Sequence, residues 1–439
     1  MYVTTKSSFA RNAFTVASGT VLAQAIPAVS SPLLTRLYAP SEFGVLALYL
    51  SLVAIGAVAA TGRYELAIVV PADNRDARAL TQLSLAVSAA SSFVFLLVAV
   101  GARVSGASVA SWETLGGRLL LVPAGIFLSA SVQSTSYWLS RHTQFTTLAQ
   151  GRVVQSAAML GTQLAGGLLR PFGSTLIIGH LCGLAASVFT QRWRGRMAAG
   201  ALQLLPLETA RLRRVAYTFR EYPTFLVLGH VANVVSSQLP VLLLATLFNP
   251  AIAGLYALAE RVLVLPSSVI GSAIGDVYRQ RAAAHYREFG HCRDLFLRTQ
   301  RQLAILSVVP CLTIVGFGAP LFGWIFGEKW EASGALASIL AGMIFFQMVS
   351  SPLSQTVYLA GMHRLDMIWQ FTRLGVSASA LFVGARLSSK PETAVLLYSI
   401  AFAVMHVVHS MMQYYAAKGR SALSHEEHEK NTSYRSGTP

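Results

Sequence analysis

Long apolar segments recur along the whole chain, with short polar stretches between them. Each segment has about 20 residues, the length that a helix needs to cross a hydrocarbon core of about 30 Å. Barrel strands would instead alternate apolar and polar residues over about 10 positions. The pattern therefore predicts an all-α polytopic membrane protein with about twelve transmembrane helices, at 13–35, 44–68, 80–101, 119–139, 147–169, 173–190, 222–247, 251–275, 302–325, 333–359, 366–387 and 393–416.

Composition supports the membrane interpretation. Of the 439 residues, 54% are hydrophobic and 12% are charged, whereas soluble domains carry about 25% charged residues. The net charge of +16 would suit either a nucleic-acid partner or a membrane protein with basic cytoplasmic loops. Because the basic residues lie between the apolar segments, we expect membrane lipids as partners and no nucleic acid.

The distribution of Lys and Arg predicts the orientation of the chain. With a cytoplasmic N-terminus, the inner segments hold 24 basic residues and the outer loops hold 7. Cytoplasmic loops carry the excess of positive charge in membrane proteins. We therefore predict a bacterial inner-membrane protein with both termini in the cytoplasm, and an even number of spans.

The longest inner connection divides the chain near its midpoint. This division predicts an N-terminal six-helix bundle at 1–190, a basic cytoplasmic linker at 191–221 and a C-terminal six-helix bundle at 222–417. The linker contains an amphipathic piece, Leu202–Arg214, that could lie on the membrane surface. The polar segment 418–439 is expected to be a disordered cytoplasmic tail.

An internal repeat relates the two halves. The loop into the second segment and the loop into the eighth align at an offset of 210 residues, with four identities: Pro40/Pro250, Gly44/Gly254, Ala47/Ala257 and Leu48/Leu258. Chance matching among common membrane residues is the alternative. Proline begins a turn and glycine permits close helix packing. Since six spans separate the copies, we predict a parallel repeat, an arrangement common in transporters, around a central cavity.

Three stretches carry a resemblance to a known family. They are 31–71, 248–283 and 321–361, of which the last contains IFGEKW followed by a helix of small residues and a Ser-Pro pair. Together they resemble the polysaccharide-transporter branch of the multidrug/oligosaccharidyl-lipid/polysaccharide exporter superfamily, which includes the O-antigen and oligosaccharide flippases. The resemblance extends over roughly residues 10–420.

The resemblance implies a fold and a function. Two six-helix bundles would enclose a V-shaped cavity and alternate its access. The substrate would be an undecaprenyl-pyrophosphate-linked oligosaccharide, moved from the cytoplasmic to the periplasmic leaflet for surface polysaccharide biosynthesis. Partners would be this lipid-linked oligosaccharide and membrane lipids, and other polysaccharide-assembly membrane proteins are further candidates.

Ionisable residues inside the spans are the candidates for the substrate pathway, because such residues are expensive in lipid and usually functional. Glu260 and Arg261 lie near the middle of the eighth segment. Arg261 is our first candidate for contact with a diphosphate or a sugar, with Glu260 as its balancing charge; a structural pair with another helix is the alternative. Arg63 and Glu65 would line the cytoplasmic mouth if the second helix continued to Val70, and would be loop residues if it ended at Gly62.

Two further arginines lie near the cytoplasmic ends of their segments, Arg152 in the fifth and Arg373 in the eleventh. A planar guanidinium binds phosphate with two parallel hydrogen bonds, so both could belong to a capture site. Either side chain could instead extend its charged end to the membrane surface.

The chain lacks the motifs of the enzymes considered. It has no GxxxxGK[ST], HExxH or GxSxG sequence, so we expect no ATP hydrolysis, no cofactor and no catalytic residue. Energy would come from an ion gradient or the membrane potential. The alternatives are another exporter or antiporter of the same superfamily, a major-facilitator carrier, whose loop motif does not fit, and a membrane-embedded polysaccharide polymerase or ligase. The short outer loops disfavour the last.

Overall fold

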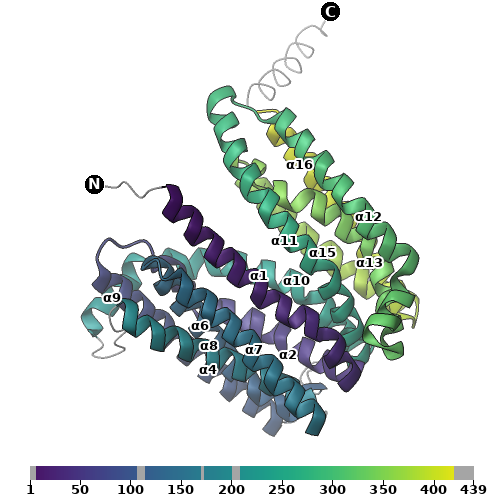
Figure 1. The fold of residues 1–439 in the computed structure, drawn as a ribbon, viewed down its shortest axis with the longest axis horizontal. Coiled ribbons are helices and arrows are strands. Elements are labelled where there is room, and N and C mark those ends of the chain that lie inside the picture. Colours follow the sequence, from purple (N-terminus) through teal and green to yellow (C-terminus); the bar gives the residue numbers. More distant parts are fainter. Residues whose placement is uncertain (1–5, 106–113, 170–172, 200–207, 420–439) are drawn as a thin grey trace, which may run out of the picture. The chain divides into compact units, whose positions relative to one another are not determined.

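The computed structural model describes residues 6–105, 114–169, 173–199 and 208–419, which form helices and connecting turns with no strand (Figure 1). Nine helices within these ranges are long and apolar enough to cross a membrane. The all-α polytopic membrane class is therefore confirmed, whereas the number of twelve spans stays a prediction.

The chain forms two compact units. Unit 1 comprises Met1–Ala257 and a short return segment, Ile325–Lys329. Its elements are α1 (Lys6–Leu37), α2 (Pro40–Ala60), α3 (Tyr64–Ala67), α4 (Asn74–Ser105), η1 (Gly116–Leu121), α6 (Val122–Arg141), α7 (Phe145–Leu169), α8 (Gly173–Ala199), α9 (Thr209–Thr218), the π-helical turn η2 (Tyr222–Leu226), α10 (Val227–Leu247) and the start of α11 (Pro250–Phe289).

Unit 2 comprises Leu258–Trp324 and Trp330–Pro439. It holds the remainder of α11 and then, apart from the return segment Ile325–Lys329, the elements α12 (Arg293–Phe326), η3 (Glu328–Trp330), α13 (Glu331–Ser350), η4 (Ser351–Leu353), α14 (Gln355–Leu359), α15 (His363–Leu387) and α16 (Pro391–Ala417). The boundary between the units falls inside α11.

Small residues and hydroxyl groups hold the helices of unit 1 together. In this unit α7 lies along α8 (Figure 1), and a Cβ added at Gly125 of α6 would overlap the Tyr49 hydroxyl of α2. Ser84 of α4 and Ser134 of α6 share a buried hydrogen bond of 2.8 Å. Where the surroundings are apolar, helices associate through such close packing and interhelical hydrogen bonds.

The two copies of the repeat contact each other inside unit 1. A Cβ added at Gly44 would overlap the carbonyl oxygen of Pro250, and one added at Gly254 would overlap that of Pro40. The contact is reciprocal, so each glycine receives the first turn of the other copy. Both positions require glycine, because the two backbones approach each other too closely at Gly44 and Gly254 for any side chain.

A short amphipathic helix, α9, is tied to α4 by charge. Arg211 bonds to Asp73 at 3.3 Å, to Asp76 at 3.2 Å and to Glu208 at 2.9 Å. The backbone N–H of Arg75, and then the guanidinium of Arg211, hold the pKa of Asp73 below its usual value. The predicted amphipathic piece therefore packs against the bundle at its C-terminal end, and its residues 202–207 lie outside the described part.

Unit 2 uses the same means of packing. Gly318 of α12 and Gly334 of α13 each leave no space for a Cβ against the other's backbone. The Ser338 hydroxyl lies 2.7 Å from the Ile314 carbonyl, and the Ser399 hydroxyl of α16 donates to the Ile339 carbonyl at 2.8 Å. The helices of this unit are therefore fixed by backbone contacts as well as by apolar side chains.

The compact units do not coincide with the bundles predicted from the sequence. Helix α8 continues to Ala199, beyond the predicted end at 190, and α10 packs against α2 in unit 1. Compact units are defined by contacts between residues, whereas the predicted bundles were defined by the loops and the internal repeat. The division into bundles at 190, 222 and 417 therefore stays a prediction. Residues 420–439 of the predicted tail lie outside the described residues.

Candidate functional site

The predicted pair Arg63 and Glu65 lies at a break in the helix rather than on a continuous one. Helix α2 ends at Ala60, Arg63 has a left-handed backbone (φ 58°), and α3 begins at Tyr64. Of the two alternatives, continuation of the helix to Val70 is therefore excluded. A residue other than glycine in this backbone region is held there by its surroundings.

Arg63 and Glu65 form a buried ion pair in unit 1. Arg63 Nη1 lies 3.1 Å from Glu65 Oε1, and the Glu65 side chain has no exposed surface. Glu65 Oε2 and His230 Nδ1 have no hydrogen-bond partner among the described residues. Tyr137 of α6 and His230 of α10 lie close enough to interact electrostatically with both charges. Among the described residues, the Glu65 carboxylate can therefore accept a further hydrogen bond at Oε2.

Arg152 and the pair Glu260–Arg261 lie in separate units. Arg152 is half-buried near the start of α7 in unit 1, whereas Glu260 and Arg261 are half-buried on α11 in unit 2. None of the three is a freely solvated loop residue. The structure does not bring the six predicted residues together within one unit.

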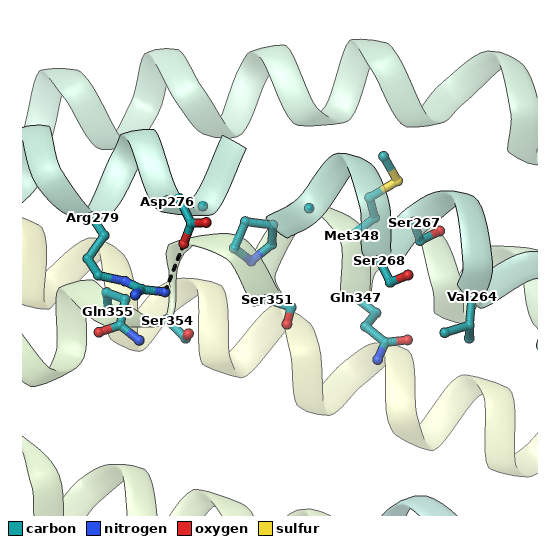
Figure 2. A pocket seen from close by; sticks show the side chains of 13 residues that line it. Val264, Ser267, Ser268, Asp276, Arg279, Gln347, Met348, Ser351, Ser354 and Gln355 are labelled. Carbon is teal, nitrogen blue, oxygen red and sulfur yellow. Dashed lines mark ion pairs between the residues drawn. The ribbon is translucent and has the colours of Figure 1, made fainter. Parts of the chain in front are cut away.

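A cavity with both polar and apolar walls lies in unit 2, one helical turn beyond Glu260 and Arg261. Its volume is about 320 Å³. Figure 2 shows side chains from α11, α13, η4 and α14 around it. The residues that line it are Val264, Ser267, Ser268, Gly271, Gly275, Asp276, Arg279, Gln347, Met348, Ser351, Pro352, Ser354 and Gln355.

Helical periodicity explains why α11 forms one wall of this cavity. The lining positions 264, 267, 268, 271, 275 and 279 recur at intervals of three or four, which places them on one face. Residues 260 and 261 precede Val264 at the same intervals. Gly271 and Gly275 leave room for Pro352, which would lie 3.4 Å from a Cβ at either position.

The chemistry of the lining is that of a site for hydroxyl-rich ligands. Four serines and two glutamines supply donors and acceptors that can match sugar hydroxyls. At one end Asp276 and Arg279 form an ion pair of 3.3 Å, and both side chains remain more than half exposed. An exposed guanidinium at this position can donate hydrogen bonds to a phosphate oxygen in place of its carboxylate partner.

Arg373 has a different setting from the one expected. Its guanidinium carbon lies 4.8 Å from the centre of the Trp369 ring and 5.5 Å from that of Phe402. Two aromatic faces therefore hold the cation within unit 2.

Next to Arg373 lies a buried polar cluster that the sequence reasoning missed. Asp366 of α15 accepts hydrogen bonds from Tyr358 (2.8 Å) and Gln370 (2.6 Å), and it lies 3.7 Å from His409 Nε2. On the other side of the ring, His409 Nδ1 lies 3.2 Å from the Ser350 hydroxyl. The available signal was the spacing of His406, His409 and Gln413, which recur on one face of the last span.

Ser350, His409 and Asp366 are the residue types of a hydrolytic triad and contact one another in that order. Unlike the serine of such a triad, Ser350 is not accessible to a substrate. Ser350 has no exposed surface, and its hydroxyl also faces His406 at 3.4 Å. A nucleophile must reach the substrate, so this cluster is not a catalytic site of that kind.

Comparison with known proteins agrees with the fold. A multidrug resistance MATE family transporter of the MOP superfamily, in an inward-facing conformation, superposes with a TM-score of 0.69 at 12% identity, over 90% of this chain and 95% of that one. The lipid II flippase MurJ, in an inward closed conformation, superposes with a TM-score of 0.68 at 10% identity, over 92% and 87%. The chain therefore shares the fold of these two membrane transporters.

The family follows from the sequence match. The family model described as "Polysaccharide biosynthesis protein" matches residues 33–335, and the chain belongs to this family. The teichuronic acid biosynthesis protein TuaB of Bacillus subtilis is 20% identical over 67% of this chain. The lipopolysaccharide biosynthesis protein WzxC of Escherichia coli is 21% identical over 69%. The matched regions span 59% and 58% of these two relatives.

Proposed function

We propose that the chain is a flippase that moves an undecaprenyl-pyrophosphate-linked oligosaccharide from the cytoplasmic to the periplasmic leaflet of the bacterial inner membrane. The observation that carries the proposal is the serine- and glutamine-lined cavity of unit 2 in a chain of the polysaccharide biosynthesis family. The hydroxyl and amide groups of this cavity can bind a glycan, whose own hydroxyls replace water on binding.

The polar head group and the lipid tail have opposite requirements. Moving a diphosphate and several sugars through hydrocarbon would leave many polar groups without partners. A protein that supplies hydroxyls, amides and a guanidinium along the way removes that penalty, while the tail stays in the lipid. Alternating access of the two halves, with both termini in the cytoplasm, is the motion that we propose for this chain.

The energy source proposed for this movement is an ion gradient or the membrane potential. The diphosphate carries negative charge, and the membrane potential acts on each charge with about 2.3 kcal/mol per 100 mV. No nucleotide-binding motif occurs in the sequence.

Gene deletion followed by lipid analysis tests the proposed function. The deletion strain should accumulate full-length lipid-linked oligosaccharide in the cytoplasmic leaflet and lack the surface polymer. Normal surface polymer in a strain without a second flippase would contradict the proposal. Accumulation of single repeat units in the periplasmic leaflet would instead indicate a polymerase or a ligase.

Complementation of that strain tests the cavity itself. Gln347→Ala and Arg279→Ala should restore little polymer at normal protein level, because they remove an amide and the guanidinium from the lining. The matched control is Arg281→Ala, an exposed arginine of the same helix that does not line the cavity. Full complementation by both cavity variants would remove the cavity from the pathway.

A further inference from the structure

We propose that His409, paired with Asp366, is a reversible proton-binding site whose protonation state acts on the wall of the cavity in unit 2. This site rests on the proposed function and deepens it, since it names the proton as the coupling ion. Five residues of the site are buried, each with at most 5% of its surface exposed: Ser350, Asp366, His406, His409 and Gln413. Imidazole is the side chain that normally changes charge between pH 5 and 8.

The neutral ring of His409 has a polar group on each side. Gln413 Nε2 lies 3.2 Å from His409 Nδ1 and donates to the Ser350 carbonyl at 3.0 Å. In the tautomer in which Nδ1 accepts from Gln413, the ring hydrogen is on Nε2, which lies 3.7 Å from Asp366 Oδ1. The carboxylate is held in place by Tyr358 and Gln370, both of which donate to its other oxygen.

Protonation adds one proton from water to Nδ1 and changes three contacts. The new N–H donates to the Ser350 hydroxyl, which already lies 3.2 Å away. Gln413 loses its acceptor on the ring and must turn its amide. The imidazolium then forms a charged pair with Asp366, 3.7 Å away.

The other charged and titratable groups around the site set its balance. Helix α15 supplies Arg373, which lies over Trp369, and α16 supplies His406 and Tyr398. Helix α14 supplies Tyr358, against which His363 stacks. The formal charges of the Asp366 carboxylate and the Arg373 guanidinium sum to zero, so protonation of His409 gives the cluster a net positive charge.

The site is connected to the cavity through covalent neighbours. Ser350 is the last residue of α13 and directly precedes Ser351, which lines the cavity. Tyr358, which donates to Asp366, belongs to α14, whose first residue, Gln355, also lines it. The segment 351–355 is thus held at both ends by hydrogen-bond partners of the Asp366–His409 pair. A ligand and a proton that both act on this segment must affect each other's binding.

A spectroscopic test is built into the site, because the Trp369 ring stacks on His409 at 3.9 Å with an interplanar angle of 16°. The purified full-length protein in lipid nanodiscs is titrated from pH 8 to pH 5, and the emission of Trp369→Phe is subtracted. Protonation of His409 should quench the Trp369 component. His409→Gln should abolish the quenching, and Asp366→Asn should reduce it by more than half at pH 6.

Two controls locate the effect. His180→Gln replaces a histidine of unit 1 that packs edge-on against Tyr49, and His406→Gln replaces the histidine that meets Trp369 edge-on; both should retain the quenching. Quenching that is absent in the wild type, or unchanged in His409→Gln, would overturn the proposal. If Trp369→Phe does not fold, the Cε1 resonance of His409 in histidine-labelled protein reports the same protonation.

Hydrogen–deuterium exchange tests the connection to the cavity. After correction for the intrinsic effect of pH, exchange in 351–362 should differ between pH 8 and pH 6 in the wild type and not in His409→Gln. Identical exchange at both pH values in the wild type would overturn the coupling. Since these measurements need no lipid-linked sugar, they can fail while the deletion strain behaves as proposed, and the reverse also holds.

Discussion

Each unit buries a carboxylate beside a basic side chain, and the two pairs are built differently. In unit 1, Arg63 and Glu65 are two residues apart on a strained turn, and one carboxylate oxygen has no hydrogen-bond partner among the described residues. In unit 2, Asp366 and His409 come from different helices. Tyr358 and Gln370 donate to Asp366 Oδ2, the carboxylate oxygen that does not face His409. The first pair depends on a single partner and the second on a network.

The number of donors to each buried carboxylate decides how it responds to the loss of its partner. A buried charge with one partner is severely destabilised when that partner is removed. A networked carboxylate retains other donors, so its partner can change protonation state without unfolding the surroundings. Unit 1 therefore has the properties of a structural pair, and unit 2 has those of a switch.

The largest effect that we predict tests the single-partner pair. Arg63→Ala should lower the stability of the protein by about 3–5 kcal/mol, because it leaves the Glu65 carboxylate buried without a counter-charge. Thermal unfolding of the purified protein in detergent measures it. The double variant Arg63→Ala/Glu65→Gln should recover most of the loss. A single variant as stable as the wild type would show that water already reaches Glu65.

A smaller loss is expected in the network. Asp366→Leu leaves two donors, Tyr358 and Gln370, without their acceptor, which should destabilise the protein by about 1–3 kcal/mol. The same thermal measurement applies, with Asp366→Asn as the matched variant that keeps one acceptor. If Asp366→Leu were more damaging than Arg63→Ala, the contrast between the two units would be reversed.

The aromatic setting of Arg373 should contribute less again. Replacing the cation by Arg373→Leu removes two contacts with aromatic faces and should cost about 0.5–2 kcal/mol. Arg373→Lys keeps the charge and should lose less. Equal stability of the wild type, Arg373→Leu and Arg373→Lys would mean that the ring contacts of the guanidinium do not stabilise the protein.

The smallest effect concerns the exposed ion pair of the cavity. Asp276→Asn breaks a pair whose side chains are 57% and 72% exposed, and such pairs contribute about 0–1 kcal/mol. Stability should therefore stay nearly constant, while the released Arg279 becomes a better phosphate ligand. Polymer export in the deletion strain should be equal to or above that of the wild type. A clear loss of stability would show that this pair is structural.

Some features of the candidate site could be predicted from the sequence because they depend on local pattern. Charges in an apolar run stand out by their transfer cost, so these residues could be proposed as candidates: Arg63, Glu65, Arg152, Glu260, Arg261 and Arg373. Asp366 was missed because it lies at the edge of a predicted span, where a carboxylate is unremarkable. Ser350 and Gln413 were missed because neutral polar residues give no signal until partners from other helices surround them.

The sequence by itself determined that this is a helical membrane protein with a repeated proline–glycine hairpin, since bilayer thickness and backbone hydrogen bonding leave few other solutions for such segments. The family also followed from the sequence. Tertiary structure alone decided that α2 breaks at Ala60 and buries Glu65, that Gly44 and Gly254 receive each other's backbone, and that His409 meets Asp366. These are contacts between distant segments, and their energies depend on distances that no local pattern contains.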